Sequence, residues 1–380
     1  MYVIGLNSGT SFDGIDVALV TFKRNNLIPS FIDGIVYEYP IEIKKRIKDL
    51  IIFVGNSRDC SLRQGHEISQ LNFLLGELFA LAVLKIINKN KLKPKDVLLI
   101  GSHGQTIYHH PQVETIGGFK IKSTLQIGES SVIAQRTGIK TVSNFREGDI
   151  AASGQGAPLI SYLDWITFHK SKDIKAILNI GGIVNITILG NNITPMAFDI
   201  GPGNALIDLV SQKDFKKDYD SYGKMAATGK INFELIENAL KDDYFKLKPP
   251  KTTGKEYFNQ DFINKYFSNI KNKHERIATL TFFTAITIEK AFKDFISNKY
   301  KVNEIVISGG GIKNRTLMEH LITLLPDIKI VLSDKYNLPY KYKEAILFAL
   351  LGYTCHLGIC NNIPSCTGAK KKVILGKITN

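Results

Sequence analysis

Residues 176–204 read AILNIGGIVNITILGNNITPMAFDIGPGN, and this stretch decides the fold. It contains three runs of β-branched and other apolar residues, at 176–180, 186–189 and 196–198, separated by segments with glycine and asparagine. Such runs bounded by turn residues are typical of β-strands. The stretch therefore predicts successive strands that end in a rigid Gly-Pro-Gly turn.

Helical and strand-like patterns alternate on both sides of this stretch. Downstream, apolar residues at helical spacing over 280–295 precede a strand-like run at 304–307, and another helical pattern covers 317–324. Upstream, two β-rich runs at 2–6 and 17–22 predict a hairpin with a polar loop. Residues 68, 71, 75 and 78 then mark a helix that ends near 88, and a strand-like run covers 97–100.

This alternation predicts a mixed α/β protein with two lobes of similar size. At roughly 150 residues per domain, a chain of 380 residues also predicts two or three domains. No internal repeat is visible, so the borders follow from the element pattern. We expect one lobe at 1–145 plus 355–380 and the other at 146–354, with a ligand in the cleft between them.

Composition excludes several classes of protein. The chain is 44% hydrophobic and 22% charged, which is ordinary globular usage and excludes global disorder and fibrous proteins. Apolar runs such as 345–351 stop short of the about 18 residues that cross a bilayer, and no basic leader precedes the first strand. The four cysteines show no zinc-ribbon spacing and no disulfide density. We expect a cytoplasmic protein in a reducing compartment, with no zinc site and no membrane partner.

The net charge of +14 is compatible with nucleic acid, anionic membranes or phosphorylated substrates as partners. Most of the basic residues are lysines in exposed-looking stretches, whereas arginine, which reads phosphates and base edges better, is scarce. A solvated basic surface is therefore the favoured interpretation, with no nucleic-acid partner. A nucleic-acid binder would instead bind arbitrary duplex with a steep salt dependence.

Glycine-rich turns follow three of the predicted strands, at 7–16, 179–185 and 309–314. Backbone N–H groups in such turns can converge on an anion, and no P-loop or G-x-G-x-x-G motif competes with them. Asp13 or Asp16 in the first turn could hold metal-bound water. The alternative for each turn is structural, namely a hairpin loop or close packing. Because the turns occur in both halves, they favour a nucleotide lying across an interlobe cleft.

Asp199 ends the run at 196–198 and precedes the rigid turn, where a carboxylate would point into a cleft. This is a suitable position for a general base. The alternative is an aspartate that caps the helix starting near Ala205.

Other polar residues that follow strands are candidates for binding a sugar. The segment SHGQT at 102–106 contains His103, Gln105 and Thr106, although His103 could be a structural hydrogen-bonding residue. Arg146 could clamp a carboxylate or pair with a neighbouring acid. Glu344 begins an apolar helix, and the alternative role is a first-turn carboxylate favoured by the helix dipole.

With these residues in view, the chain resembles the anhydro-N-acetylmuramic acid kinases of bacterial peptidoglycan recycling. These belong to the superfamily of sugar kinases, heat-shock chaperones and actin. The resemblance covers nearly the whole chain, in one order and spacing. Its segments are GTSFDGID at 9–16, GSHGQTIYHHP at 101–111, TLQIGE at 124–129, GQGAPL at 154–159, NIGGIVNIT at 179–187, FDIGPGN at 198–204, PPKTTGKEYFN at 249–259, ISGGGIKN at 307–314 and TGA at 367–369.

The resemblance implies a two-lobed actin-like ATPase (ribonuclease H-like) fold, with ATP and a sugar in the interdomain cleft, and a homodimer. It also implies that ATP, with magnesium, phosphorylates the 6-oxygen of 1,6-anhydro-N-acetylmuramic acid while water opens the internal ether. The product would be N-acetylmuramic acid 6-phosphate. A second carboxylate acting as acid would be redundant, because the leaving 6-oxygen takes the phosphoryl group.

The resemblance assigns roles to individual residues. Asp199 becomes the base that activates the water, and the substrate-binding candidates are His103, Gln105, Thr106, Arg146 and Glu344. The first lobe would carry the first phosphate loop, and the second lobe the catalytic aspartate with the other phosphate turn and the adenosine-side turn. The ATP- and phosphate-binding candidates are Gly9, Thr10, Ser11, Phe12, Asp13, Gly14, Ile15, Asp16, Gly181, Gly182, Asn185, Gly201, Gly203, Asn204, Gly309, Gly310, Gly311 and Asn314.

Three positions depart from the family pattern. Asn7 stands where a methionine commonly precedes SGTS, Asn144 replaces an acidic residue before FR, and Ser153 replaces a glycine before GQGAPL. Two other functions remain compatible with the sequence. One is a kinase of a related anhydro sugar such as levoglucosan, and the other is a non-catalytic ATP-binding regulator.

Overall fold

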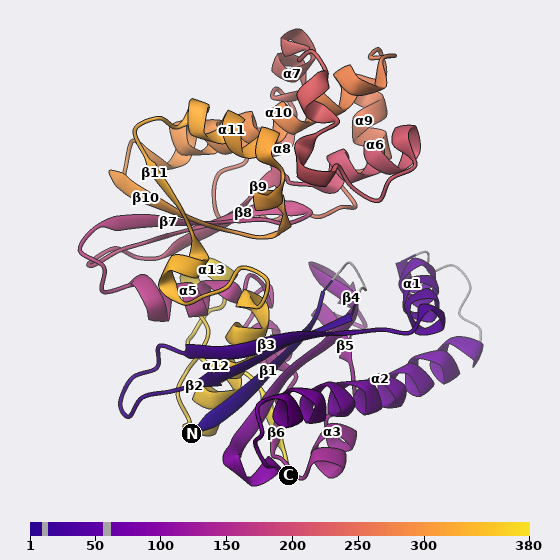
Figure 1. Cartoon of the computed structure of the whole chain (residues 1–380), viewed down its shortest axis with the longest axis vertical. Helices are drawn as coiled ribbons and strands as arrows, with labels where there is room; N and C mark the ends of the chain where they lie inside the picture. The colour runs from indigo at the N-terminus through magenta and orange to yellow at the C-terminus, as the bar shows by residue number, and fades with distance from the viewer. Residues whose placement is uncertain (10–13, 56–61) are drawn as a thin grey trace. The chain divides into compact units, whose positions relative to one another are not determined.

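The computed structural model describes residues 1–9, 14–55 and 62–380, which form two compact units. The first unit contains 1–167 and 337–380, and the second contains 168–336. Each unit has its own sheet and covering helices, so the predicted α/β class with two parts is confirmed (Figure 1).

The first unit contains a seven-stranded sheet with the order β12-β6-β4-β1-β2-β3, and β5 pairs with β4. The predicted hairpin is the antiparallel pair β1 and β2, and β1 also pairs in parallel with β4. The strands are β1 (Tyr2–Ser8), β2 (Gly14–Thr21), β3 (Ser30–Glu38), β4 (Val97–Ile116), β5 (Phe119–Ile127), β6 (Thr141–Ser143) and β12 (Lys377–Thr379).

Helices cover both faces of this sheet. Alternate residues of β1 point to opposite faces, so Ile4 and Leu6 join the apolar core with the helix α2, whereas Gly5 faces the helix α12. The helices of the first unit are α1 (Ile41–Gly55), α2 (Leu62–Lys89), α3 (Ser130–Thr137), α4 (Phe145–Ala151), α5 (Ile160–Phe168), α12 (Lys343–His356) and α13 (Pro364–Thr367).

One helix is longer and more apolar than the runs considered in the sequence. Residues 65–89 of α2 meet the length and hydropathy of a membrane span, but 56% of the most apolar window is buried inside the protein. Leu71, Leu75, Phe79 and Val83 are fully buried in the core of the first unit. This burial is that of a core helix packed on a sheet.

The second unit contains a five-stranded sheet with the order β11-β10-β7-β8-β9. The three strands predicted within 176–198 are its antiparallel members β7, β8 and β9, and β10 and β11 add in parallel. The strands are β7 (Ile174–Ile180), β8 (Ile183–Leu189), β9 (Met196–Pro202), β10 (Val302–Ser308) and β11 (Lys329–Leu332).

The two sheets share one topology. Each sheet begins with three consecutive antiparallel strands, β1–β3 in the first unit and β7–β9 in the second. Two later strands then extend the sheet in parallel from the outer edge of β1 or β7. These are β4 and β6 in the first unit and β10 and β11 in the second. No sequence repeat indicates this shared topology. Strand order depends on the sense of the connections and on apolar patterning, which very different residues can supply.

The helices of the second unit form a separate aromatic core around Phe258, Phe262, Phe267 and Phe283. They are α6 (Ala205–Phe215), α7 (Phe233–Ala239), α8 (Asp243–Lys246), α9 (Gln260–Phe267), α10 (Lys273–Ala291) and α11 (Arg315–Leu324), with a π-helical turn at Phe292–Ile296. The short helical turns are Ser221–Gly223, Ala226–Thr228, Gly310–Lys313 and Ser333–Tyr336, besides Pro94–Asp96 in the first unit.

The borders of the units differ from those expected from the sequence. Residues 146–167 and 337–354 belong to the first unit, although we expected them in the second lobe. The reason is α12, whose backbone lies directly on the first sheet. A Cβ at Gly5 would lie 1.8 Å from the carbonyl oxygen of Ala345, so only glycine permits this approach.

Candidate active site

Asp199 lies on β9 and is held by the segment that connects α8 to α9. Its backbone N–H donates to the carbonyl oxygen of Lys251 at 2.9 Å, and its Oδ2 accepts from the N–H of Thr253 at 3.0 Å. Burial raises the pKa of Asp199 to about 6, although the bond from Thr253 opposes the shift. A fixed carboxyl group with a pKa near the working pH has the properties of a general base.

The capping role considered for Asp199 does not occur. The helix α6 begins at Ala205, and its N-cap residue is Asn204. Asp199 instead lies within the sheet, where it pairs with Asn185 on β8. Asn185 pairs in turn with Asn179 on β7, and Asn179 pairs with Ser308 on β10. Because paired residues share a face of the sheet, Asp199 ends a row of polar side chains.

The turn at Gly181 and Gly182 contacts the start of α6. The N–H groups of Gly203 and Ala205 donate to the Gly182 carbonyl oxygen at 2.9 and 3.1 Å, and the N–H of Asn204 donates to Gly181 at 2.8 Å. A Cβ at Gly203 would lie 2.3 Å from the Gly181 oxygen, so this packing requires glycine. These three amides are used within the protein, and a phosphate beside the turn would need other donors. Gly201 is buried against the ring of Phe245 in the same region.

The three glycines after β10 differ in their surroundings. A Cβ at Gly309 would lie 2.5 Å from the carbonyl oxygen of Ile180, and one at Gly311 would lie 2.2 Å from the Ile180 side chain. Both glycines therefore permit close packing on β7. Gly310 has open space, since the nearest atom to an added Cβ is 3.9 Å away. Asn314 caps α11 by accepting from the N–H of Leu317 at 3.0 Å.

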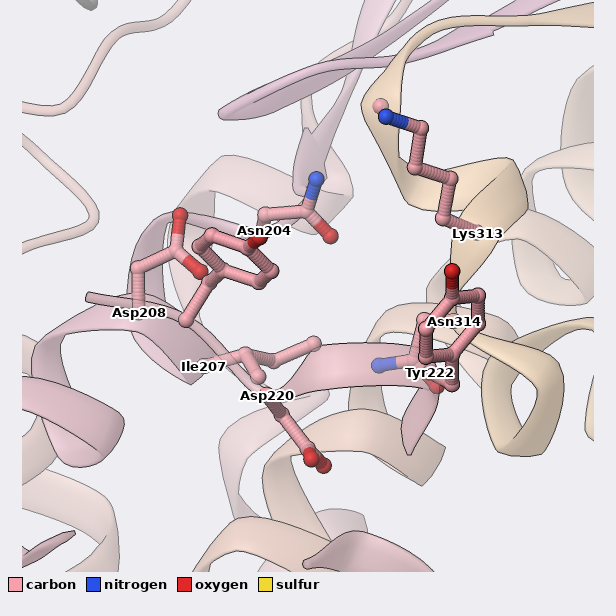
Figure 2. Close-up of a pocket in the computed structure, with 9 residues that line it drawn as sticks. Asn204, Ile207, Asp208, Asp220, Tyr222, Lys313 and Asn314 are labelled. Carbon is pink, nitrogen blue, oxygen red and sulfur yellow. The ribbon is translucent and has the colours of Figure 1, made fainter. Parts of the chain in front are cut away.

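A pocket of about 280 Å³ lies beside this turn (Figure 2). Figure 2 shows side chains of α6 on one side and of the turn before α11 on the other. Burial raises the pKa of Asp208 in this pocket to about 7, and Lys255 opposes the shift. The lining residues are Asn204, Ile207, Asp208, Tyr219, Asp220, Tyr222, Gly310, Lys313 and Asn314. Tyrosine rings, amides and carboxylates suit a nucleoside, which needs stacking and hydrogen bonds.

In the first unit, Arg146 and His103 contact each other directly. Arg146 Nε donates to His103 Nε2 at 3.0 Å, and Arg146 Nη1 donates to the carbonyl oxygen of Gly156 at 2.7 Å. Because arginine can only donate, His103 Nε2 must be the unprotonated nitrogen, and Nδ1 donates to the Gly104 oxygen at 3.1 Å. Burial lowers the pKa of His103 well below its usual value. His103 therefore orients Arg146 as a neutral base.

Glu344 lies in the first turn of α12 and contacts β1. Its Oε2 accepts from Asn7 Nδ2 at 2.6 Å. Burial lowers the pKa of Arg146, and the negative charge of Glu344 is the strongest of the effects that raise this pKa. Glu344 and Arg146 are therefore electrostatically coupled. Asn7, which departs from the methionine usual in the family, supplies Glu344 with a hydrogen-bond donor that methionine lacks.

Gln105 and Thr106 lie on β4 in two hydrogen-bonded pairs. Gln105 is fully buried, and its Oε1 accepts from Ser8 Oγ at 2.5 Å. Thr106 Oγ1 accepts from Gln126 Nε2 at 3.2 Å. Gln126 also lines a second pocket of about 390 Å³ with Asn144, and its Oε1 is buried without a partner in the described structure.

The loop at 9–16, which the resemblance predicts to bind phosphate, is described only in part, since Thr10, Ser11, Phe12 and Asp13 lie outside the described residues. Asp16 lies on β2 opposite Asn7, and Ile15 is fully buried. A Cβ at Gly14 would lie 2.4 Å from the carbonyl oxygen of Tyr37, whereas Gly9 has open space around it.

The other departures from the family pattern adopt left-handed backbone conformations. Ser153 has a φ of 71° and Asn144 a φ of 59°. A glycine adopts such a φ more easily than serine, which explains why glycine is usual at 153. Asn144 Nδ2 donates to Glu147 Oε1 at 2.6 Å, an interaction that an acidic residue could not make.

The predicted site residues therefore fall into two groups. Asp199 and the turns at 181–185, 201–204 and 309–314 belong to the second unit. The substrate candidates and the loop at 9–16 belong to the first. Sequence reasoning missed Asp208, Thr253 and Lys255. The segment at 249–259 carried the signal, because it was part of the resemblance but had been given no role.

The chain matches known proteins over its whole length. The family model described as anhydro-N-acetylmuramic acid kinase matches residues 1–380. An anhydro-N-acetylmuramic acid kinase of Caldanaerobacter subterraneus subsp. tengcongensis is 43% identical over 99% of this chain and 96% of the relative. One of Francisella tularensis subsp. novicida is 42% identical over 99% of this chain and 98% of the relative.

Solved structures resemble the chain more distantly. The activator of the 2-hydroxyisocaproyl-CoA dehydratase from Clostridium difficile with bound ADPNP is 12% identical, with a TM-score of 0.44 over 93% of this chain and 94% of that one. A ROK family glucokinase from Streptomyces griseus in complex with glucose and AMPPNP is 11% identical, with a TM-score of 0.40 over 93% and 100%.

Proposed function

Because the chain belongs to the anhydro-N-acetylmuramic acid kinase family, we propose that it phosphorylates 1,6-anhydro-N-acetylmuramic acid with ATP while hydrolysing the anhydro bridge. The products are ADP and N-acetylmuramic acid 6-phosphate, as in peptidoglycan recycling. The observation that carries this proposal is the fixed carboxyl group of Asp199, whose pKa of about 6 suits a base near neutral pH.

In the proposed reaction, Asp199 takes a proton from a water that attacks the anomeric carbon. The bond between the anomeric carbon and the 6-oxygen breaks, and this oxygen receives the γ-phosphoryl group of ATP. The leaving oxygen is thereby stabilised without a second acidic carboxyl group. The row that contains Asn185 and Asn179 gives Asp199 polar neighbours suited to ordering the water.

Arg146 and His103 support the choice of sugar. The muramic acid substrate carries a carboxylate, and an arginine oriented by His103 can bind it with charge-assisted hydrogen bonds. Levoglucosan carries no carboxylate, so Arg146 favours the muramic acid sugar over that alternative. Gln105, Thr106 and Glu344 are the proposed partners of the sugar hydroxyl and amide groups.

The pocket beside Asp208 is the proposed adenosine site. Its tyrosines and the open face of Gly310 can accommodate the base, and Asn204 and Asp208 offer hydrogen-bond partners for the ribose. From this pocket the phosphates would extend toward Asp199. A non-catalytic regulator would need the pocket but not the base.

Magnesium is the proposed cofactor of ATP. No group of three His, Cys, Asp or Glu side chains able to hold a metal occurs within residues 1–9, 14–55 and 62–380. In the proposed function the ion enters with the nucleotide and keeps several waters, since Mg²⁺ often needs only one or two carboxylates beside substrate phosphates. Asp16, which the sequence offered as a residue able to hold metal-bound water, is the described candidate, and the ion would neutralise phosphate charge.

The proposed setting is cytoplasmic, and the proposed assembly is a homodimer. Light scattering on the purified protein tests the assembly. ADP release tests the function: turnover with 1,6-anhydro-N-acetylmuramic acid but not with levoglucosan supports the proposal. Preferred turnover of levoglucosan would identify levoglucosan as the substrate in place of the muramic acid sugar. ATP binding without any turnover would favour a non-catalytic regulator.

A further inference from the structure

Two of the three lysines in the segment between α8 and α9, Lys251 and Lys255, lie in different surroundings. Lys251 is buried, and its ammonium lies 4.4 Å from the centroid of the Tyr244 ring while donating to the Tyr244 carbonyl oxygen at 3.1 Å. Lys255 is exposed and makes no ion pair within the described residues. Lys251 is therefore part of the packing, whereas the exposed Lys255 makes no ion pair within the described residues and acts on Asp208 only through its charge.

Three observations locate Lys255 beside the proposed path of the phosphates. A Cβ at Gly182 would lie 2.6 Å from Lys255 Cε and 3.5 Å from its Nζ, so the lysine lies over the glycine turn at 179–185. Lys255 is the charge that opposes the raised pKa of Asp208, which lines the pocket. It also follows Thr253 by two residues, and Thr253 binds Asp199.

Three backbone N–H groups at the start of α6 are already used within the protein. The N–H groups of Gly203, Asn204 and Ala205 donate to the carbonyl oxygens of the glycine turn. A helix N-terminus would otherwise bind a phosphate with these amides. With these amides used, a cationic side chain between the pocket and Asp199 is a suitable source of compensation for the charge of a triphosphate. Lys255 lies closer to the Asp199 segment than Lys313, which lines the far side of the pocket in the turn before α11.

We propose that Lys255 binds the phosphate groups of the nucleotide and compensates the charge of the phosphoryl group during transfer. The proposal rests on the ATP-dependent function proposed above. The Gly182 position permits this role because any larger residue there would displace the lysine. Lys255 would thus act as a phosphate-binding residue that the glycine-rich motifs do not include.

The test compares Lys255→Gln with Lys255→Arg and with Lys248→Gln as a matched control. Lys248 is exposed in the same connection and is outside the site. Calorimetry measures binding of ATP and of adenosine to each purified full-length variant, and a coupled assay measures kcat and KM. Lys255→Gln should weaken ATP binding about tenfold or more and lower kcat/KM on the order of 10²-fold, with adenosine binding unchanged. Lys255→Arg should retain most of the ATP affinity, and Lys248→Gln should match the wild type.

Equal losses of ATP and adenosine affinity would overturn the proposal, because they indicate a structural role for Lys255. Unchanged ATP binding in Lys255→Gln would also overturn it. A wild type that turns over no sugar would defeat the proposed function alone. In that case, a selective loss of ATP affinity in Lys255→Gln would still support the phosphate contact.

Discussion

Arg146 Nε donates to Nε2 of His103, and this bond determines the tautomer of the histidine. His103 is buried and Arg146 is partly buried at this contact, so exchanging the bond for water would cost free energy. The pair orients the guanidinium together with the bond from Nη1 to the Gly156 carbonyl oxygen, and no bond from Nη2 occurs within the described residues. The proposed recognition of a carboxylated sugar depends on this orientation.

Arg146→Lys should weaken sugar binding, because a lysine cannot bond to both His103 and Gly156 while binding a carboxylate. We expect KM for the anhydro sugar to rise by about tenfold or more, with KM for ATP little changed. Steady-state kinetics with each substrate varied in turn measures both. An equal rise in the two KM values would contradict the assignment.

Asp199→Asn should fold and bind ATP but lose turnover by a factor on the order of 10² or more. Asparagine keeps the size of the side chain, and its oxygen can still accept from the Thr253 N–H, but it cannot take a proton. Circular dichroism and nucleotide binding serve as controls for folding. Turnover close to that of the wild type would remove Asp199 as the base.

The pH dependence of the reaction follows from the same group. Burial raises the pKa of Asp199 to about 6, and only the ionised form accepts a proton. We therefore expect kcat/KM to fall about tenfold per pH unit below that value and to level off above it. A profile that stays flat through this range, measured with saturating magnesium and ATP, would contradict a base with this pKa.

Asn7→Asp should destabilise the first unit, whereas Asn7→Met should be tolerated. The aspartate would lie next to Glu344, where Asn7 now donates at 2.6 Å, and two close carboxylates repel each other when both are ionised. We expect a lower Tm at about pH 8, with partial recovery at about pH 5, where one carboxyl group can be protonated. The same loss at both pH values would show that charge is not the cause.

Gly311→Ala and Gly310→Ala should act differently. A Cβ at 311 would lie 2.2 Å from the Ile180 side chain, whereas 310 has open space beside the pocket. Gly311→Ala should cost about 1–3 kcal/mol of stability by overpacking. Gly310→Ala should preserve the Tm and raise KM for ATP. Chemical denaturation and kinetics separate the two effects, and equal destabilisation would contradict the packing.

The sequence predicted the strands around Asp199 well, because β-branched runs and turn residues report on local structure. It did not predict the shared topology of the two sheets, which depends on long-range strand pairing. It placed α12 in the wrong unit, because nothing local indicates that Gly5 receives a helix backbone.

The candidate site shows the same division. Asp199, His103 and Arg146 were predicted because polar residues were expected to follow strands, although Asp199 and His103 lie within β9 and β4. Asp208 and Lys255 were missed, since they lie on a helix and a loop, and only folding brings both near the glycine turns. The glycines themselves proved ambiguous from sequence: Gly203, Gly309 and Gly311 are required for close packing, whereas Gly310 opens onto the pocket.

The most direct test of the proposed reaction is ADP release from ATP, magnesium and 1,6-anhydro-N-acetylmuramic acid, with mass analysis of the sugar product. The account predicts a product heavier than the substrate by one phosphoryl group and one water. A phosphorylated product that retains the anhydro bridge, or no sugar turnover at all, would contradict it.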